Sequence, residues 1–296
     1  MNSKPLRLVA ALSILAASSA WADDPFVFNN GNVDGRMAVA SRPGATGITE
    51  IEAADDFLAT GLTTITGASF TGLLTAGAAL PSVSEIVVEI YRVFPFDSNT
   101  VRTPNVPTRV NSPSDVAFDS RDSAVAGDFS FVTTTLAVTF TANNSVAAGG
   151  IHPSPNQTTG GNGPVTGQEV RFDLTFAHAL VLPANHYFFI PQVRLTGGGQ
   201  FYWLSSTRPI VAPGTPFAPD LQSWTRDAAL DPDWLRVGTD IVGGQTPPTF
   251  NQAFSLSGTV AAVPEPESWA LMLAGLAGVS AFARRTRRGA SAKRRD

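Results

Sequence analysis

The stretch Val170-Arg-Phe-Asp-Leu-Thr-Phe176 decides the fold class of this chain. Apolar residues occupy every second position and polar residues fill the gaps, a period of two that is typical of a β-strand with one buried face. Leu136–Phe140 and Phe254–Val260 alternate nearly as regularly. Residues 23–263 contain no long segment with the helical period of 3.6 residues. The pattern therefore predicts an all-β fold.

Three further segments have the composition of strands. Glu85–Phe94, Leu62–Leu74 and Tyr187–Leu195 are rich in β-branched and aromatic residues and are bounded by glycine, proline or asparagine. Gly197-Gly-Gly199 follows the last of them and predicts a hairpin to the next strand. About ten strands separated by turns are typical of a β-sandwich or a jelly roll. We therefore expect residues 23–260 to form one β-sandwich domain.

The N-terminus has the three parts of a secretory signal peptide. Two basic residues make it positive, Leu8–Ala17 is an apolar run, and Ala20 and Ala22 form an A-x-A cleavage site. We therefore expect residues 1–22 to be a helical signal peptide that is removed after export. Export by this signal peptide would place the β-sandwich domain outside the cytoplasm.

The C-terminus carries a second set of targeting features. Pro264-Glu265-Pro266 is a short acidic motif that its two prolines keep out of a helix. The uncharged run Trp269–Ala283 follows, and as a helix it would be about 22 Å long, shorter than the ~30 Å core of a bilayer. Arg284 and Arg285 come next. By the positive-inside rule, we expect a single transmembrane helix with a cytoplasmic C-terminus. The alternative is a buried C-terminal helix of the domain, which a one-sided arginine cluster does not favour.

This order of motif, apolar run and basic cluster resembles the PEP-CTERM sorting domain of Gram-negative bacteria. The resemblance covers residues 261–296 and assigns the sorting signal to Pro264, Glu265, Pro266, Arg284 and Arg285. It implies that exosortase, an inner-membrane enzyme similar to cysteine transpeptidases, recognises the tail and cuts at or near the proline–glutamate–proline motif. The precursor would be held transiently in the inner membrane, and the product would reach the cell surface or the extracellular matrix. Such proteins often occur in species that make exopolysaccharide and biofilm.

The charge of the chain narrows its choice of partners. Residues 23–263 contain 21 acidic residues and 11 arginines, a net charge of −10, whereas the whole chain has a net charge of −4. An acidic surface repels nucleic acid, so we expect no nucleic-acid partner. The chain contains no cysteine, which excludes disulfides, thiolate metal sites and cysteine nucleophiles.

Calcium is the cofactor that this composition suits best, and we expect no other. Asp231 and Asp233 are close neighbours in a turn-like segment, and carboxylates in loops are ligands that Ca²⁺ prefers. Further candidates are Asp119, Asp122, Asp227 and Asp240. The chain has no EF-hand loop. The alternative is a set of solvated turn aspartates that bind no ion.

The tryptophans are the candidates for contact with carbohydrate. Trp203, Trp224 and Trp234 lie close together in the sequence, among serine, arginine and aspartate residues. Exposed aromatic rings hold sugars by stacking, whereas buried rings stabilise the core. Core packing is the alternative and the more common position of tryptophan in such a fold.

The chain lacks the motifs of the common catalytic classes. His-Glu-x-x-His, Gly-x-Ser-x-Gly, the P-loop and the dinucleotide-binding glycine motif are all missing. We therefore predict a non-enzymatic protein of the cell surface or of an exopolysaccharide matrix. The alternatives are a carbohydrate-binding module and a secreted hydrolase, which needs two carboxylates about 5–9 Å apart in a cleft. Asp55 and Asp56 are no such pair, because neighbouring side chains of an extended segment point to opposite faces.

Overall fold

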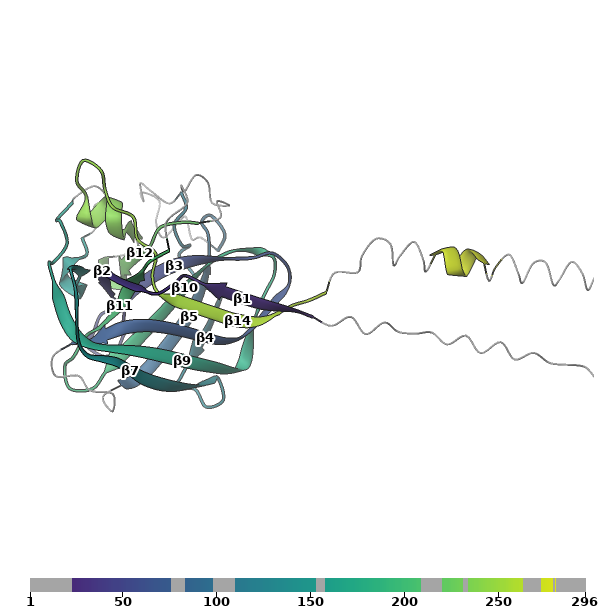
Figure 1. Ribbon diagram of the computed structural model, residues 1–296, viewed down its shortest axis with the longest axis horizontal. Coiled ribbons are helices and arrows are strands. Elements are labelled where there is room, and N and C mark those ends of the chain that lie inside the picture. Colours follow the sequence, from purple (N-terminus) through teal and green to yellow (C-terminus); the bar gives the residue numbers. More distant parts are fainter. Residues whose placement is uncertain are drawn as a thin grey trace, which may run out of the picture. The chain divides into compact units, whose positions relative to one another are not determined.

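Fourteen strands make up most of the part of the chain that the structure describes (Figure 1). This computed structural model describes residues 23–75, 83–97, 110–152, 158–208, 220–230, 234–262, 273–278 and 280. The strands are β1 (Asp24–Asn29), β2 (Val33–Ala40), β3 (Ile51–Ala59), β4 (Thr63–Leu74), β5 (Val83–Arg92), β6 (Asp119–Asp122), β7 (Phe129–Ala142), β8 (Asn144–Val146), β9 (Val165–Leu182), β10 (Asn185–Leu195), β11 (Phe201–Ser206), β12 (Trp224–Asp227), β13 (Leu235–Arg236) and β14 (Phe254–Val260). Short helical turns are η2 (Ala148–Gly150), η3 (Ala228–Leu230) and η4 (Val237–Val242). The all-β prediction is confirmed.

Two sheets divide these strands between them. In the eight-stranded sheet the order is β1-β14-β4-β11-β2-β8, and β9 joins β4 and carries β7 on its far side. In the six-stranded sheet the order is β13-β12-β3-β10-β5-β6. Among the described strand pairs, β2 with β8 is parallel and the others are antiparallel. The chain crosses repeatedly from one sheet to the other, so the two layers are built from interleaved segments.

The alternating stretch that predicted the fold lies inside β9. Its Phe172 is in register with Phe70 of β4, and the two buried rings stack with centroids 4.8 Å apart. Arg171 and Asp173, on either side of Phe172, point to the opposite face and form an ion pair of 2.9 Å there. The period of two therefore separates a core face from a solvent face, as the sequence predicted.

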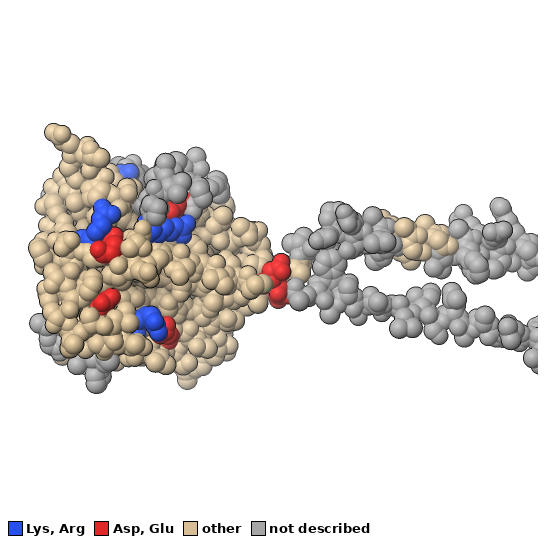
Figure 2. Space-filling model, in the orientation of Figure 1, with Lys and Arg blue, Asp and Glu red and all other residues tan. Residues whose placement is uncertain are grey.

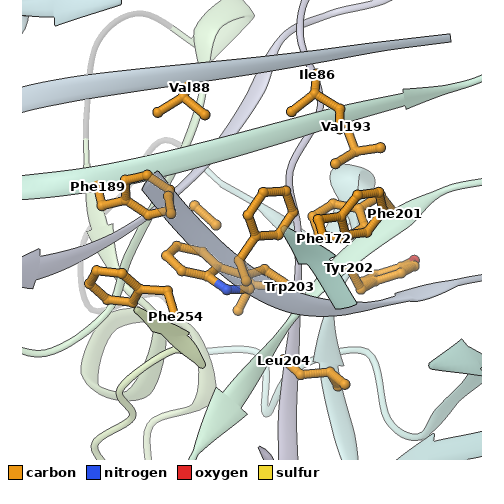
Figure 3. Packing of buried hydrophobic residues seen from close by; sticks show 14 of the residues in the cluster. Ile86, Val88, Phe172, Phe189, Val193, Phe201, Tyr202, Trp203, Leu204 and Phe254 are labelled. Carbon is orange, nitrogen blue, oxygen red and sulfur yellow. The ribbon is translucent and has the colours of Figure 1, made fainter. Parts of the chain in front are cut away.

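An aromatic core joins the inner faces of the two sheets (Figure 3). The ring of Trp203 in β11 lies 6.0 Å from that of Phe189 and 5.6 Å from that of Phe254, measured between centroids. Phe189 of β10 and Phe254 of β14 stack on each other at 5.1 Å. Because β10 and β14 belong to different sheets, this stack connects the two layers. Burial of each such ring contributes about 1.5–3 kcal/mol.

A second apolar cluster covers the outer face of the six-stranded sheet. Phe188 of β10 is in register with Tyr91 of β5, and both side chains are buried there with Trp224 and Trp234. The indole Nε1 of Trp234 donates to the carbonyl of Ser114 at 2.9 Å, so the segment before β6 lies over this face. The six-stranded sheet is thus covered on both faces, which removes polar groups on its outer face from water.

The glycine-rich connection after Leu195 differs from its prediction. Gly197–Gly199 does not close a hairpin, because β10 pairs with β3 and β5 whereas β11 pairs with β2 and β4. The chain crosses between the sheets at this point. Gly197 and Gly198 have φ values of 85° and 84°, a region that glycine enters without strain. The glycines therefore serve a crossover turn.

The predicted targeting segments fall largely outside the described residues. This holds for residues 1–22, including Ala20 and Ala22, and for the motif Pro264-Glu265-Pro266. Within the expected membrane span, residues 273–278 and 280 are helical. The described part of the chain contains no helix with the length and apolar character needed to cross a bilayer. The signal peptide and the transmembrane helix stay predictions.

The first and last strands of the unit Asp24–Ala261 lie side by side. β1 pairs with β14 in antiparallel register, from Asp24 opposite Val260 to Asn29 opposite Ser255. Figure 1 shows the purple β1 and the yellow-green β14 next to each other. Both ends of this unit therefore emerge at neighbouring positions of the eight-stranded sheet.

Candidate functional site

A groove of about 430 Å³ lies on the outer side of the eight-stranded sheet. Strands β1, β2, β4, β7, β9 and β14 and the loop between β1 and β2 contribute to it. The lining residues are Asn29, Gly31, Asn32, Val33, Ser69, Phe70, Thr71, Leu136, Glu169, Arg171, Ala253, Phe254 and Ser255. A volume of this size is sufficient for a small ligand.

Polar groups dominate the open side of this groove. Ser69 and Ser255 are in register on β4 and β14, and their hydroxyl groups form a hydrogen bond of 2.8 Å. Arg171 is bound to Asp173, and its side chain is 45% exposed. Burial raises the pKa of Glu169. Figure 2 shows this face in the orientation of Figure 1, where the few charged side chains lie mostly as adjacent blue and red groups on a largely uncharged surface. Such a lining can form hydrogen bonds with a ligand rich in hydroxyl groups.

The tryptophans predicted to contact carbohydrate lie in the interior instead. Trp203, Trp224 and Trp234 are each at most 1% exposed. Trp203 packs in the core between the sheets, where its Nε1 donates to the carbonyl of Ala253 at 3.0 Å. Trp224 and Trp234 pack in the outer cluster of the six-stranded sheet. A ring that protein covers on both sides cannot stack on a sugar, so this prediction is wrong and these rings pack in the core.

The aspartates predicted to bind calcium are only partly described. Asp231 and Asp233 lie outside the described residues, and calcium binding there stays a prediction. Asp240 is buried and accepts hydrogen bonds of 3.0 and 2.9 Å from the guanidinium of Arg236. Asp119 forms an ion pair with the arginine two residues later. These two carboxylates are thus committed to protein partners.

Three glutamates gather on the covered face of the six-stranded sheet. One carboxylate oxygen from each of Glu50, Glu52 and Glu89 lies within 4.8 Å of the other two. Glu50 and Glu52 share a face at the start of β3, because side chains alternate along an extended segment. Glu89 comes from β5, on the other side of β10. The sequence did not predict this cluster. The spacing of Glu50 and Glu52 places both on one face, but nothing local indicates that Glu89 lies beside them.

Arg226 and Tyr91 bind the innermost of these carboxylates. Arg226 of β12 is in register with Glu52, and its Nε donates to Oε2 of that residue. The hydroxyl of Tyr91 donates to Oε1 of Glu52 at 2.9 Å. The guanidinium carbon of Arg226 also lies 4.7 Å from the ring centroid of Trp234. Glu52 is fully buried, so these bonds act where water does not screen them.

Burial and the charges of neighbouring carboxylates raise the pKa of Glu89 and of Glu50. Burial, followed by the charges of Glu52 and Glu50, raises the pKa of Glu89 to about 8. Burial and the charge of Glu52 also raise the pKa of Glu50. Near pH 7 Glu89 therefore retains its proton in most molecules, because the charge of Arg226 offsets only part of this increase.

Asp55 and Asp56 point to opposite faces, as the extended chain predicted. The Oδ2 atom of Asp55 accepts hydrogen bonds of 2.6 Å from the side-chain amide of Asn30 and from the backbone N–H of Gln252. Asp56 lies 2.6 Å from Nε2 of His186. Burial and the charge of Asp56 raise the pKa of Asp55 well above the usual 3.8. Because they face apart, these carboxylates do not act on one substrate.

Comparison with known proteins identifies the tail. Residues 262–288 match the family model of the PEP-CTERM protein-sorting motif, and the match begins two residues after β14 ends. The chain carries a PEP-CTERM sorting signal. The matched residues include all five that the sequence assigned to sorting, namely Pro264, Glu265, Pro266, Arg284 and Arg285. The PEP-CTERM motif marks an exported protein of Gram-negative bacteria that exosortase sorts and processes. No curated protein and no solved structure matches this chain.

Proposed function

We propose that this PEP-CTERM protein is a non-enzymatic component of the cell surface or of an exopolysaccharide matrix. The observation that carries the proposal is the position of the sorting motif directly after the last strand. The folded unit Asp24–Ala261 is the exported domain, and the tail is its sorting signal. Held in the inner membrane by its tail, the precursor would present the unit outside the cytoplasm until exosortase releases it.

The end of β14 supports processing at the proline–glutamate–proline motif. β14 ends at Val260, four residues before Pro264, and is paired with both β1 and β4. A cut at or near the motif therefore removes no residue of either strand ladder. The released unit keeps its fold because every described hydrogen bond of β14 lies on the retained side.

Intact-mass analysis of the protein from its host tests this proposal. The expected product begins at Asp23 and lacks Arg284–Asp296, whereas an exosortase-deficient strain accumulates the uncut form. Glu265→Gln should slow cutting, and Glu267→Gln is the matched control because it removes a neighbouring carboxylate outside the motif. A secreted product that still contains Arg284–Asp296 in the wild-type host would contradict the proposal.

Binding of exopolysaccharide is the second candidate function, and the groove on the eight-stranded sheet favours it. Hydroxyl, amide, carboxyl and guanidinium groups line the groove, and sugars offer hydroxyl groups to each of them. The buried tryptophans supply no stacking surface. We therefore propose weak recognition by hydrogen bonds along a polymer, in which many adjacent units add to the affinity.

A polysaccharide pull-down with paired arginine variants tests this second function. Arg171 lines the groove, and Arg171→Ala should decrease retention by about tenfold, the loss expected for a hydrogen bond from a charged donor. Arg36 is similarly exposed, at 55% against 45%, and does not line the groove, so Arg36→Ala is the control. Equal retention of both variants and the wild type would exclude the groove as the binding surface.

The geometry gives less support to a hydrolase. Among the residues that line the groove, Glu169 is the single carboxylic acid, and a glycosidase needs two. The acidic cluster brings carboxylates close enough, but Arg226 and Tyr91 already occupy both oxygens of Glu52. Glu52 is therefore held by an ion pair and a hydrogen bond inside the protein, which does not suit a residue that must act on a substrate.

A further inference from the structure

The three glutamates of the acidic cluster carry more negative charge than the neighbouring arginine can neutralise. Glu50, Glu52 and Glu89 carry three negative charges when ionised, and the described cation among them is Arg226. The remaining charge of −2 lies on a covered sheet face, where a fully buried Glu52 is surrounded by protein. Uncompensated charge in such a place is costly, so either protons or a divalent cation must offset it.

Gln192 provides a second observation, which comes from a buried amide rather than from a carboxylate. It is 0% exposed, and its side-chain amide reaches the cluster because Nε2 donates to Oε1 of Glu50 at 2.9 Å. Its own Oε1 is buried and has no hydrogen-bond partner. A buried amide oxygen without a partner costs about 1–3 kcal/mol. A half-turn of the amide would place this oxygen where Nε2 now meets Glu50, and an amide oxygen is a ligand for hard cations.

We propose that Glu50, Glu52, Glu89 and Gln192 form a binding site for a divalent cation, and that the cation is calcium. The proposal concerns a surface separate from the polar groove and does not depend on polysaccharide binding. The ion would contact Glu50 and Glu89 directly, bind the Gln192 oxygen after the amide turns, and neutralise the two negative charges that Arg226, paired with Glu52, leaves without a cation. Because the ligands come from β3, β5 and β10 and the residue before β3, the ion would fasten three adjacent strands.

The dimensions and the donor atoms favour calcium over other common ions. Calcium–oxygen distances are about 2.3–2.6 Å, so ligands on opposite sides of the ion lie about 4.6–5.2 Å apart. One oxygen from each of the three carboxylates lies within 4.8 Å of the other two, so a single calcium ion can span the cluster. Magnesium needs distances of about 2.0–2.1 Å and a stricter octahedron. Zinc prefers imidazole and thiolate ligands, and the cluster has neither. Glu50 and Glu89 are partly exposed, which gives water access to complete the coordination.

Thermal unfolding of the exported protein purified from its host tests the proposal. We expect 10 mM calcium chloride to raise Tm by about 3–10 °C over 1 mM EDTA, given the affinities of extracellular calcium sites and a domain of this size. Titration calorimetry should show one calcium ion per chain, and magnesium should bind more weakly. No shift with calcium, or equal binding of magnesium, would overturn the assignment.

Isosteric variants separate a built site from general charge screening. Glu50→Gln and Glu89→Gln should each weaken calcium binding at least tenfold, because each removes one charged ligand and little volume. Asp173→Asn is the control, since it removes an exposed carboxylate from the other sheet. Glu50 is partly exposed, so its variant remains informative if Glu89→Gln fails to fold. Retained binding in both glutamate variants, or an equal loss in Asp173→Asn, would refute the site.

Discussion

Replacement of Arg226 by methionine should strongly destabilise the domain. Methionine fills most of the space of the aliphatic stem but lacks the guanidinium that binds Glu52. Glu52 is fully buried and would lose its cationic partner while it keeps the hydrogen bond from Tyr91. Removal of one partner from a buried ion pair costs about 3–5 kcal/mol. In a domain of this size each kcal/mol lowers Tm by roughly 2–4 °C, so Arg226→Met should melt about 6–20 °C below the wild type.

A second substitution distinguishes the unpaired charge from lost packing. In the double variant Arg226→Met/Glu52→Gln the buried carboxylate is neutral, and most of the lost stability should return. Arg171→Met is the control, because its partner Asp173 is exposed and such pairs contribute only about 0–1 kcal/mol. Urea unfolding at pH 7, followed by near-ultraviolet circular dichroism, measures all three variants. If Arg226→Met loses no more stability than Arg171→Met, or the double variant recovers nothing, the electrostatic reasoning is wrong.

Two further substitutions test burial and backbone packing. Burial and the charge of Asp56 raise the pKa of Asp55, so the stability that this carboxyl group contributes is fully present below the usual pKa of 3.8 and is lost as pH rises through the higher folded value. Asp55→Asn should therefore be about 1–3 kcal/mol more stable than the wild type at pH 8 and show no such gain at pH 3. Urea unfolding across this pH range measures the difference. Gly258→Ala would place its Cβ 1.9 Å from the carbonyl oxygen of Thr64 and should lower the free energy of unfolding by at least about 1–3 kcal/mol. The control is Gly149→Ala, whose Cβ meets nothing within 4 Å, and it should change the free energy of unfolding by less than about 0.5 kcal/mol. A stable Gly258→Ala variant, or a pH profile of Asp55→Asn parallel to that of the wild type, would show that the packing or the charge is not as described.

Local patterns in the sequence predicted the strands because alternation is a property of neighbouring residues. β14 has the predicted bounds Phe254–Val260, and the predicted Val170–Phe176 lies within β9. The connection at Gly197–Gly199 was predicted wrongly, because a glycine turn fits a hairpin and a crossover between sheets equally well. Which strand lies beside which depends on contacts far apart in the sequence, and no local pattern encodes them.

The sites show the same division between local and distant information. The sorting motif could be predicted because motif, apolar run and arginines are contiguous. The acidic cluster could not, because Arg226 reaches Glu52 across 174 positions and Glu89 comes from another strand. Tryptophan composition alone could not separate a sugar-binding surface from a core. Only the burial of Trp203, Trp224 and Trp234 decided between them.

The pairing of β1 with β14 links the fold to the order of export. If the N-terminus leaves the cytoplasm first, β1 cannot form its pairs until β14 has followed, and β14 is almost the last part of the folded unit. In an export that starts at the proposed signal peptide, β14 would complete the eight-stranded sheet just before the sorting motif follows. If the cut falls after β14, as proposed, released and uncut protein should melt at the same temperature. A lower Tm of the released form would mean that residues beyond Val260 stabilise the sheet. The tail would then contribute to the fold in addition to its role as a sorting signal.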